Sequence, residues 1–164
     1  MSRTDARIRY TQGVLKQALL SFLQEKPINK ITVKEVCERA ELNRATFYAH
    51  YSDCFALLES IEEDLLEAFQ QSLKLVDSFD VTALIEAIYT MIEQQQEACR
   101  VLIFQNVCPN VLRRMISLAR DESISYWKRH LHHITDAELE MLYTHLSNGL
   151  MHVVVEGYEK YGRE

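Results

Sequence analysis

Residues 30–51, KITVKEVCERAELNRATFYAHY, decide the fold of this chain. They contain TVKE, a capping box in which the Thr32 hydroxyl accepts a hydrogen bond from the backbone of Glu35 while the Glu35 carboxylate reaches back to the helix start. This box predicts one short helix, and Asn43 is a favoured cap for a second. Two short helices joined by the three-residue turn ELN indicate a helix-turn-helix.

The rest of the chain has the pattern of an all-α protein. Apolar residues recur at three- and four-residue spacing, strand-type alternation is scarce, and the 164 residues include only four glycines and two prolines. We expect helices over residues 5–25, 33–40, 44–50, 53–76, 81–97, 100–106, 109–133 and 136–161. The predicted architecture is a three-helix helix-turn-helix domain, residues 1–52, followed by a helical bundle, residues 53–164. The bundle begins with a linker helix over 53–76, for which Ser52 is the expected cap.

The charge is distributed unevenly along the chain. Residues 1–52 carry nine Lys and Arg against five Asp and Glu, a balance of +4. Residues 53–164 carry nine against nineteen, a balance of −10, which gives the total of −6. A basic N-terminal third joined to an acidic remainder indicates that the N-terminal part contacts a polyanion.

The sequence predicts a cytoplasmic protein without a membrane segment. No segment reaches the roughly 18 apolar residues that a membrane span requires. The N-terminus, MSRTDARIRYTQ, is charged and lacks the apolar run of a signal peptide. The cysteines are Cys37, Cys54, Cys99 and Cys108. They form no CxxC pair, and in a reducing compartment we expect free thiols instead of a disulfide.

The second short helix has the residues that insertion into a DNA major groove requires. Phe47 and Tyr51 can anchor one side in the core, while the small Ala45 and Ala49 let the backbone approach base edges. Arg44 can form a bidentate contact with guanine, and nearby hydroxyl and imidazole groups can donate to phosphates. A polar face on a short helix can also be plain solvated surface, but here the caps, the turn, the basic balance and an exposed aromatic coincide. The candidate DNA-binding residues are Thr32, Asn43, Arg44, Ala45, Thr46, Tyr48 and His50.

Residues 31–57, ITVKEVCERAELNRATFYAHYSDCFAL, resemble the N-terminal signature of TetR/AcrR-family transcriptional regulators. That signature consists of a short helix, a turn, a segment of the form S/N-x-x-T-hydrophobic-Tyr-x-His-Phe/Tyr and a linker helix. The resemblance implies a homodimer on a palindromic operator in double-stranded DNA, with a helical C-terminal half that binds an inducer or a partner. It also implies that the candidate residues named above, Asn43 being their helix cap, contact DNA.

Three positions depart from the family pattern. Glu41 stands at a turn position where the family often has glycine, and a left-handed backbone there carries a modest penalty. Cys37 replaces the usual alanine, and Cys54 replaces a lysine that commonly contacts a phosphate. Backbone N–H groups at a helix start favour a thiolate, so we expect an exposed Cys54 with a lowered pKa, sensitive to oxidation. The alternative is that Cys54 simply replaces the lysine and has no role.

The C-terminal half contains residues that could line an apolar ligand cavity. The candidate pocket residues are Tyr89, Met91, Phe104, Met115 and Trp127, together with Met141. The expected cavity is bounded by the helices at 81–97, 100–106 and 109–133. The same residues at helical spacing can instead be ordinary core. The chain has six histidines, but their spacing does not show convergence, and we expect neither a metal nor another cofactor.

The last expected helix, 136–161, is apolar over most of its circumference near residues 149–155. Such a helix requires burial on two sides, which its own bundle and a second subunit can supply. The candidate dimer-interface residues are Leu146, Leu150, Val153 and Val154. Family relatives usually continue with a further helix, so either the interface is reduced here or a C-terminal helix is missing.

Together these features predict a DNA-binding transcriptional regulator, a repressor, whose operator affinity a small molecule controls through the C-terminal helices. The alternative is a TetR-like regulator or co-activator controlled by a protein partner. An enzyme is not expected, because the chain has no glycine-rich phosphate loop, nucleophile elbow, HExxH motif or compact carboxylate pair.

Overall fold

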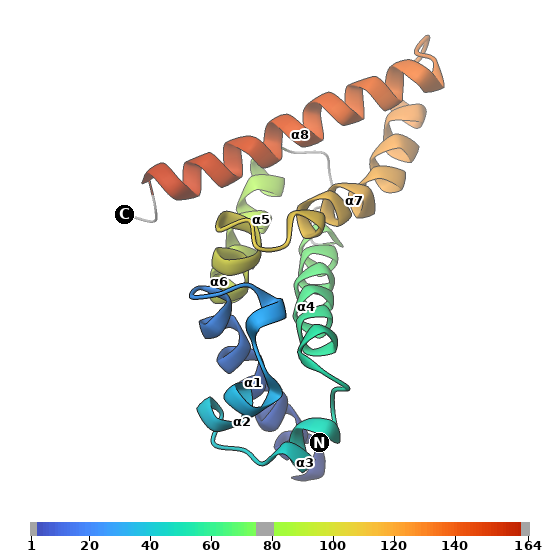
Figure 1. The fold of residues 1–164 in the computed structure, drawn as a ribbon. Coiled ribbons are helices and arrows are strands. Elements are labelled where there is room, and N and C mark those ends of the chain that lie inside the picture. The colour runs from blue at the N-terminus through green and yellow to red at the C-terminus, as the bar shows by residue number, and fades with distance from the viewer. Residues whose placement is uncertain (1–2, 75–80, 162–164) are drawn as a thin grey trace. The chain divides into compact units, whose positions relative to one another are not determined.

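The computed structural model describes residues 3–74 and 81–161, which form helices without any strand (Figure 1). In chain order these are α1 (Arg3–Leu23), the 3-10 turn η1 (Ile28–Lys30), α2 (Val33–Arg39), α3 (Arg44–Tyr48), α4 (Cys54–Lys74), α5 (Val81–Gln94), α6 (Gln96–Ala98), the π-helix η2 (Cys99–Phe104), α7 (Pro109–His130) and α8 (Asp136–Tyr161). The expected all-α class with an N-terminal helix-turn-helix is confirmed. Residues 75 and 76, the expected end of the linker helix, lie outside the described residues.

The chain packs as two compact units. Unit 1 comprises Met1–Leu65 and Glu97–Val107, and unit 2 comprises Leu66–Gln96 and Cys108–Glu164. The helix α4 belongs to both, because the boundary falls after Leu65. In unit 1 the ammonium of Lys16 donates to Asp64 Oδ2 at 2.5 Å and joins α1 to α4. The functional division expected after residue 52 stays a prediction.

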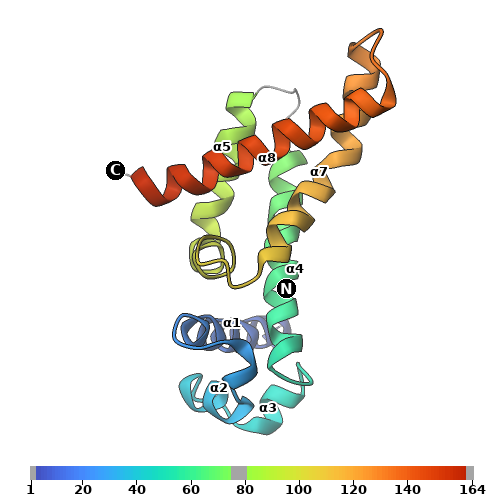
Figure 2. The same cartoon turned by 45° about the horizontal axis from the view of Figure 1, so that its top comes forward.

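The core of unit 1 lies between α1, α2, α3 and the first part of α4. Leu15 of α1, Phe47 of α3 and Leu57 of α4 are completely buried. The helices α2 and α3 follow one another beside α1 (Figures 1 and 2). The guanidinium of Arg39 lies 3.5 Å from the centroid of the Phe22 ring, a cation–π contact that ties α2 to α1.

In unit 2, α7 and α8 form a helical hairpin (Figure 1). Ile124 of α7 packs with Leu139 and Tyr143 of α8 in a buried cluster. Arg120 Nε donates to Glu140 Oε2 at 3.0 Å across the same hairpin. Apolar packing and a bidentate ion pair therefore hold α8 against α7.

The helix caps were largely predictable. The capping box of Thr32 and Glu35 is present, and the same sequence pattern at residues 135–138, TDAE, forms a second box: Thr135 Oγ1 accepts from the Glu138 N–H at 3.3 Å. The expectation that Ser52 caps α4 is wrong. The cap is Asp53, whose Oδ1 accepts from the Ala56 N–H at 2.9 Å. A carboxylate also suits the partial positive charge of a helix start better than a hydroxyl does.

Candidate nucleic-acid interface

The turn between α2 and α3 has the backbone that the sequence predicted. Glu41 adopts a left-handed conformation with φ 53°. The Leu42 N–H donates to the Cys37 carbonyl at 2.9 Å, which satisfies a carbonyl at the end of α2. A left-handed non-glycine residue costs about 1–2 kcal/mol. The turn is nevertheless formed, and it fixes the direction in which α3 leaves α2.

The cap residue of α3, Asn43, accepts hydrogen bonds from two groups of Thr46. Asn43 Oδ1 accepts from the Thr46 N–H at 2.7 Å and from the Thr46 hydroxyl at 3.0 Å. The bidentate contact fixes the first turn of a helix of only five residues. Asn43 therefore has a structural task, and the Thr46 hydroxyl proton already has an acceptor within the protein.

The two sides of α3 differ as predicted. Phe47 is completely buried and Tyr51, just after the helix, is 8% exposed. Arg44, Ala45, Tyr48 and Ala49 are exposed, and Thr46 and His50 are half-buried. The polar groups of Arg44, Tyr48 and His50 form no hydrogen bond within the described part of the chain. These groups can donate to an external acceptor without breaking an internal hydrogen bond.

Thr32 differs from these residues, because its hydroxyl is occupied. It donates to Glu35 Oε2 at 2.7 Å and accepts from the Glu35 N–H at 3.3 Å. The ammonium of Lys26 lies 2.6 Å from the same carboxylate. The Lys26 hydrogen bond, followed by those from Thr32, lowers the pKa of Glu35 to about 2. The carboxylate therefore stays ionised and keeps the start of α2 fixed.

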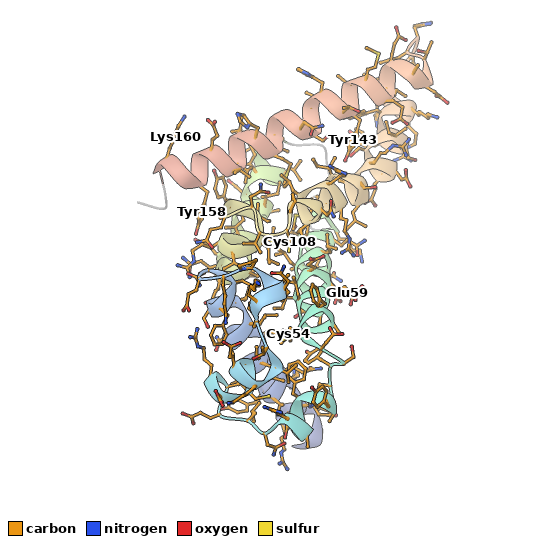
Figure 3. The ribbon with its side chains drawn as sticks, in the orientation of Figure 1. Cys54, Glu59, Cys108, Tyr143, Tyr158 and Lys160 are labelled. Carbon is orange, nitrogen blue, oxygen red and sulfur yellow. The ribbon has the colours of Figure 1, made fainter. Side chains whose placement is uncertain are left out.

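The environment of Cys54, labelled in Figure 3, differs from the sequence-based expectation. Its side chain is 4% exposed, and burial raises the pKa of the thiol to about 11, with the Asp53 charge as the next cause. The expected exposed thiol with a lowered pKa is therefore wrong. The reason is the phase of α4, because Cys54 shares the buried face of Leu57, Leu58 and Ile61. The same phase exposes Phe55, which the sequence-based prediction missed and which is 57% exposed.

Two of the candidate pocket residues, Tyr89 and Trp127, line different hollows of unit 2. Met91 and Met115 are buried, 3% and 0% exposed, whereas Phe104 belongs to unit 1. Trp127 lines an apolar hollow of about 340 Å³ within unit 2, with walls from α4, α5, α7 and α8. Tyr89 lines a separate hollow of about 350 Å³ with Tyr158 of α8 (Figure 3).

The candidate interface residues on α8 fall into two groups. Leu146 and Val153 are 49% and 62% exposed, and Met141, outside the predicted interface, is 73% exposed. Leu150 lines the apolar hollow. Val154 is 2% exposed and belongs to the buried core of the chain. Two of the four residues, Leu146 and Val153, thus leave apolar surface exposed on α8.

Two absences hold for the described residues, 3–74 and 81–161. No group of three His, Cys, Asp or Glu side chains among them is arranged to bind a metal ion. None of their helices combines the length and the apolar character needed to cross a membrane.

Known proteins are similar to this chain over different shares of its length. No protein-family model matches the chain. Over 62 residues, 38% of this chain, it is 37% identical to the uncharacterized HTH-type transcriptional regulator YxbF of Bacillus subtilis (strain 168), and the match covers 16% of that protein's length. The crystal structure of the TetR family repressor AlkX from Dietzia sp. strain DQ12-45-1b aligns over 93% of this chain and 87% of AlkX, with 15% identity and a TM-score of 0.41.

The fold and the exposed face of α3 define a helix-turn-helix protein. Its capped α2, the turn at Glu41 and the sequence of α3 resemble the N-terminal signature of TetR/AcrR-family regulators.

Proposed function

We propose that the chain is a transcriptional regulator that binds an operator through α3. The observation that supports this proposal is the two-sided α3: Phe47 is completely buried, while Arg44, Ala45, Tyr48 and Ala49 are exposed. The alanines keep the helix thin enough to approach base edges in a groove of about 12 Å width. The basic balance of +4 over residues 1–52 supplies attraction to phosphates.

The proposed contacts differ in kind. Arg44 recognises a base, most simply guanine through O6 and N7. Tyr48 and His50 donate hydrogen bonds to phosphate oxygens. The hydroxyls of Thr32 and Thr46 can do the same once they give up their internal hydrogen bonds to Glu35 and Asn43. Ala45 contributes close approach, and Asn43 acts as the cap that positions α3. Phe55, exposed at the start of α4, is a further aromatic candidate for a DNA contact.

We also propose that the regulator acts as a homodimer on a palindromic site. Two helix-turn-helix units must lie about 34–36 Å apart to contact successive major grooves. The exposed Leu146 and Val153 on α8 supply the apolar surface for this association. A dimer of this kind, seated on its operator in the cytoplasm, would act as a repressor by excluding other proteins from the site.

Control by a small molecule in unit 2 completes the proposal. The supporting observation is the apolar hollow bounded by α4, α5, α7 and α8. Control by a protein partner is the second candidate. It is supported by Met141 and Val153, which are exposed on α8 and do not line the hollow.

Operator selection from random DNA tests the DNA-binding part. We expect a palindromic sequence, and Arg44→Ala should weaken its binding by about 1–3 kcal/mol while relaxing one base-pair preference per half-site. Arg44→Lys keeps the charge but loses the bidentate fork, so it should lose the same preference with a smaller loss of affinity. Arg113→Ala on the exposed surface of α7 is the matched control for the lost charge. If Arg44→Ala weakens all sequences equally, Arg44 contacts a phosphate and not a base.

A further inference from the structure

Unit 2 contains a hollow of about 340 Å³ that four helices surround. Phe69 of α4, Ile88 of α5, Trp127 of α7 and Leu150 of α8 contribute to its walls. This volume lies at the lower end of the range of about 300–1,000 Å³ typical of small-molecule sites. We propose that the hollow binds an uncharged, apolar small molecule. The regulatory role of this molecule rests on the function proposed above, whereas its binding to the hollow does not.

The charge of the walls excludes an ionic ligand. No Asp, Glu, Lys or Arg side chain of the described residues lines the hollow. The lining residue that can carry charge is His145, and its side chain is exposed to solvent. An ionised ligand would lose hydration on binding without gaining a counter-charge. A neutral molecule does not have this loss.

The hydroxyl groups of the walls are already engaged with the backbone. Ser123 Oγ donates to the Ala119 carbonyl at 2.7 Å, and Ser147 Oγ donates to the Tyr143 carbonyl at 2.7 Å. The Tyr143 hydroxyl donates to the carbonyl of Ile116. A ligand could gain a hydrogen bond from these protons only by breaking an internal one. Shape and apolar contact, not hydrogen bonding, therefore select the ligand.

The depth of the hollow favours a small molecule over a second copy of the chain. Ile88 and Met151 line it but are only 2% and 7% exposed, so it extends inward from the exposed Leu146 on α8. A helix of a partner subunit placed on α8 could contact Leu146. A helix measures about 10–12 Å across with its side chains, and it is therefore too wide to reach those inner residues.

The test uses Trp127, the single tryptophan of the chain, as an internal fluorescent probe. Wild-type protein is titrated with 1-octanol, octanoate and octylammonium, which share a chain and differ in head-group charge. We expect a saturable change in Trp127 emission with octanol, and binding of both ions at least roughly tenfold weaker. Equal or tighter binding of either ion, or no saturable change up to the solubility of octanol, would overturn the inference. A change in Trp127 emission that depends on protein concentration and that octanol does not reverse would also overturn the inference, because a second copy of the chain would then fill the hollow.

A charged wall should reverse the preference. In Leu84→Lys a cation is placed in the hollow, and we expect octanoate to bind more tightly than octanol. Leu118→Lys makes the same change on α7 outside the hollow, at a residue that is 38% exposed, and should keep the wild-type order. If Leu84→Lys does not fold, the wild-type series still decides.

Operator binding is measured in the same samples to separate the two proposals. Specific DNA binding without octanol binding refutes this inference alone. Octanol binding without specific DNA binding refutes the proposed function alone.

Discussion

The hydroxyl of Tyr51 is a buried polar group without a hydrogen-bond partner among the described residues. Tyr51 follows α3, is 8% exposed and packs its ring 6.0 Å from that of Phe47, measured between centroids. Folding removes water from this hydroxyl and gives no hydrogen bond in return. We therefore predict that Tyr51→Phe stabilises the protein.

The expected magnitude follows from two opposing terms. An unsatisfied buried hydroxyl costs about 1–3 kcal/mol. Deleting its oxygen leaves a gap of one atom, and the lost dispersion amounts to about a few tenths of a kcal/mol. We expect a net gain near 1 kcal/mol in the free energy of unfolding. For a chain of this size that gain raises the Tm by about 2–4 °C.

Thermal melts followed by circular dichroism measure this effect, with Tyr48→Phe as the matched control. Tyr48 is 58% exposed, so its hydroxyl is hydrated in both states and its removal should change stability by less than about 0.5 kcal/mol. A Tm below that of the wild type for Tyr51→Phe would refute the reasoning. An equal rise in both variants would show that burial is not the cause.

Two further predictions concern pH and assembly. The pKa of Glu35 is lowered from 4.5 to about 2 in the folded protein, so its ion pair with Lys26 stabilises the fold above about pH 4.5, and this stabilisation is lost as the pH falls toward 2. The difference in Tm between wild type and Glu35→Gln should therefore shrink over that pH interval. A constant difference in Tm would contradict this assignment of the pKa shift. Val153→Glu should raise the dimer dissociation constant, measured by sedimentation, at least roughly tenfold. Gln70→Glu, which adds the same charge at an exposed position of α4, should leave this constant unchanged. A monomeric wild type at micromolar concentration, or a fully dimeric Val153→Glu, would exclude the α8 interface.

The features that depend on neighbouring residues could be predicted from the sequence. A capping box joins residues three apart, so Thr32 with Glu35 and Thr135 with Glu138 were readable before any packing was known. The same holds for Asn43 and Thr46. The left-handed Glu41 was implied by the family resemblance, because the family often has glycine at this turn position. Each of these contacts forms within one turn of helix, whatever the rest of the chain does.

The features that depend on distant packing could not be predicted in the same way. Cys54 lies where backbone N–H groups favour a thiolate, yet the position of its side chain depends on which face of α4 meets α1. Met115 and Trp127 lie on one helix and look alike as apolar residues in the sequence. The first is completely buried and the second lines a hollow, because α4, α5 and α8 surround them differently. Helical spacing gives the face of a helix but not its neighbours.

The continuity of α4 offers a physical basis for the proposed control of DNA binding. Asp64 accepts from the Lys16 ammonium of α1, and Ser60, one turn earlier, accepts through its carbonyl at 3.4 Å. Phe69, five residues after Asp64, lines the apolar hollow. Five residues of helix span only about 7.5 Å, and an intact helix of that length moves as one body. A ligand at Phe69 that rotated or displaced this part of α4 would therefore also move Asp64 against Lys16, whose side chain is 16% exposed.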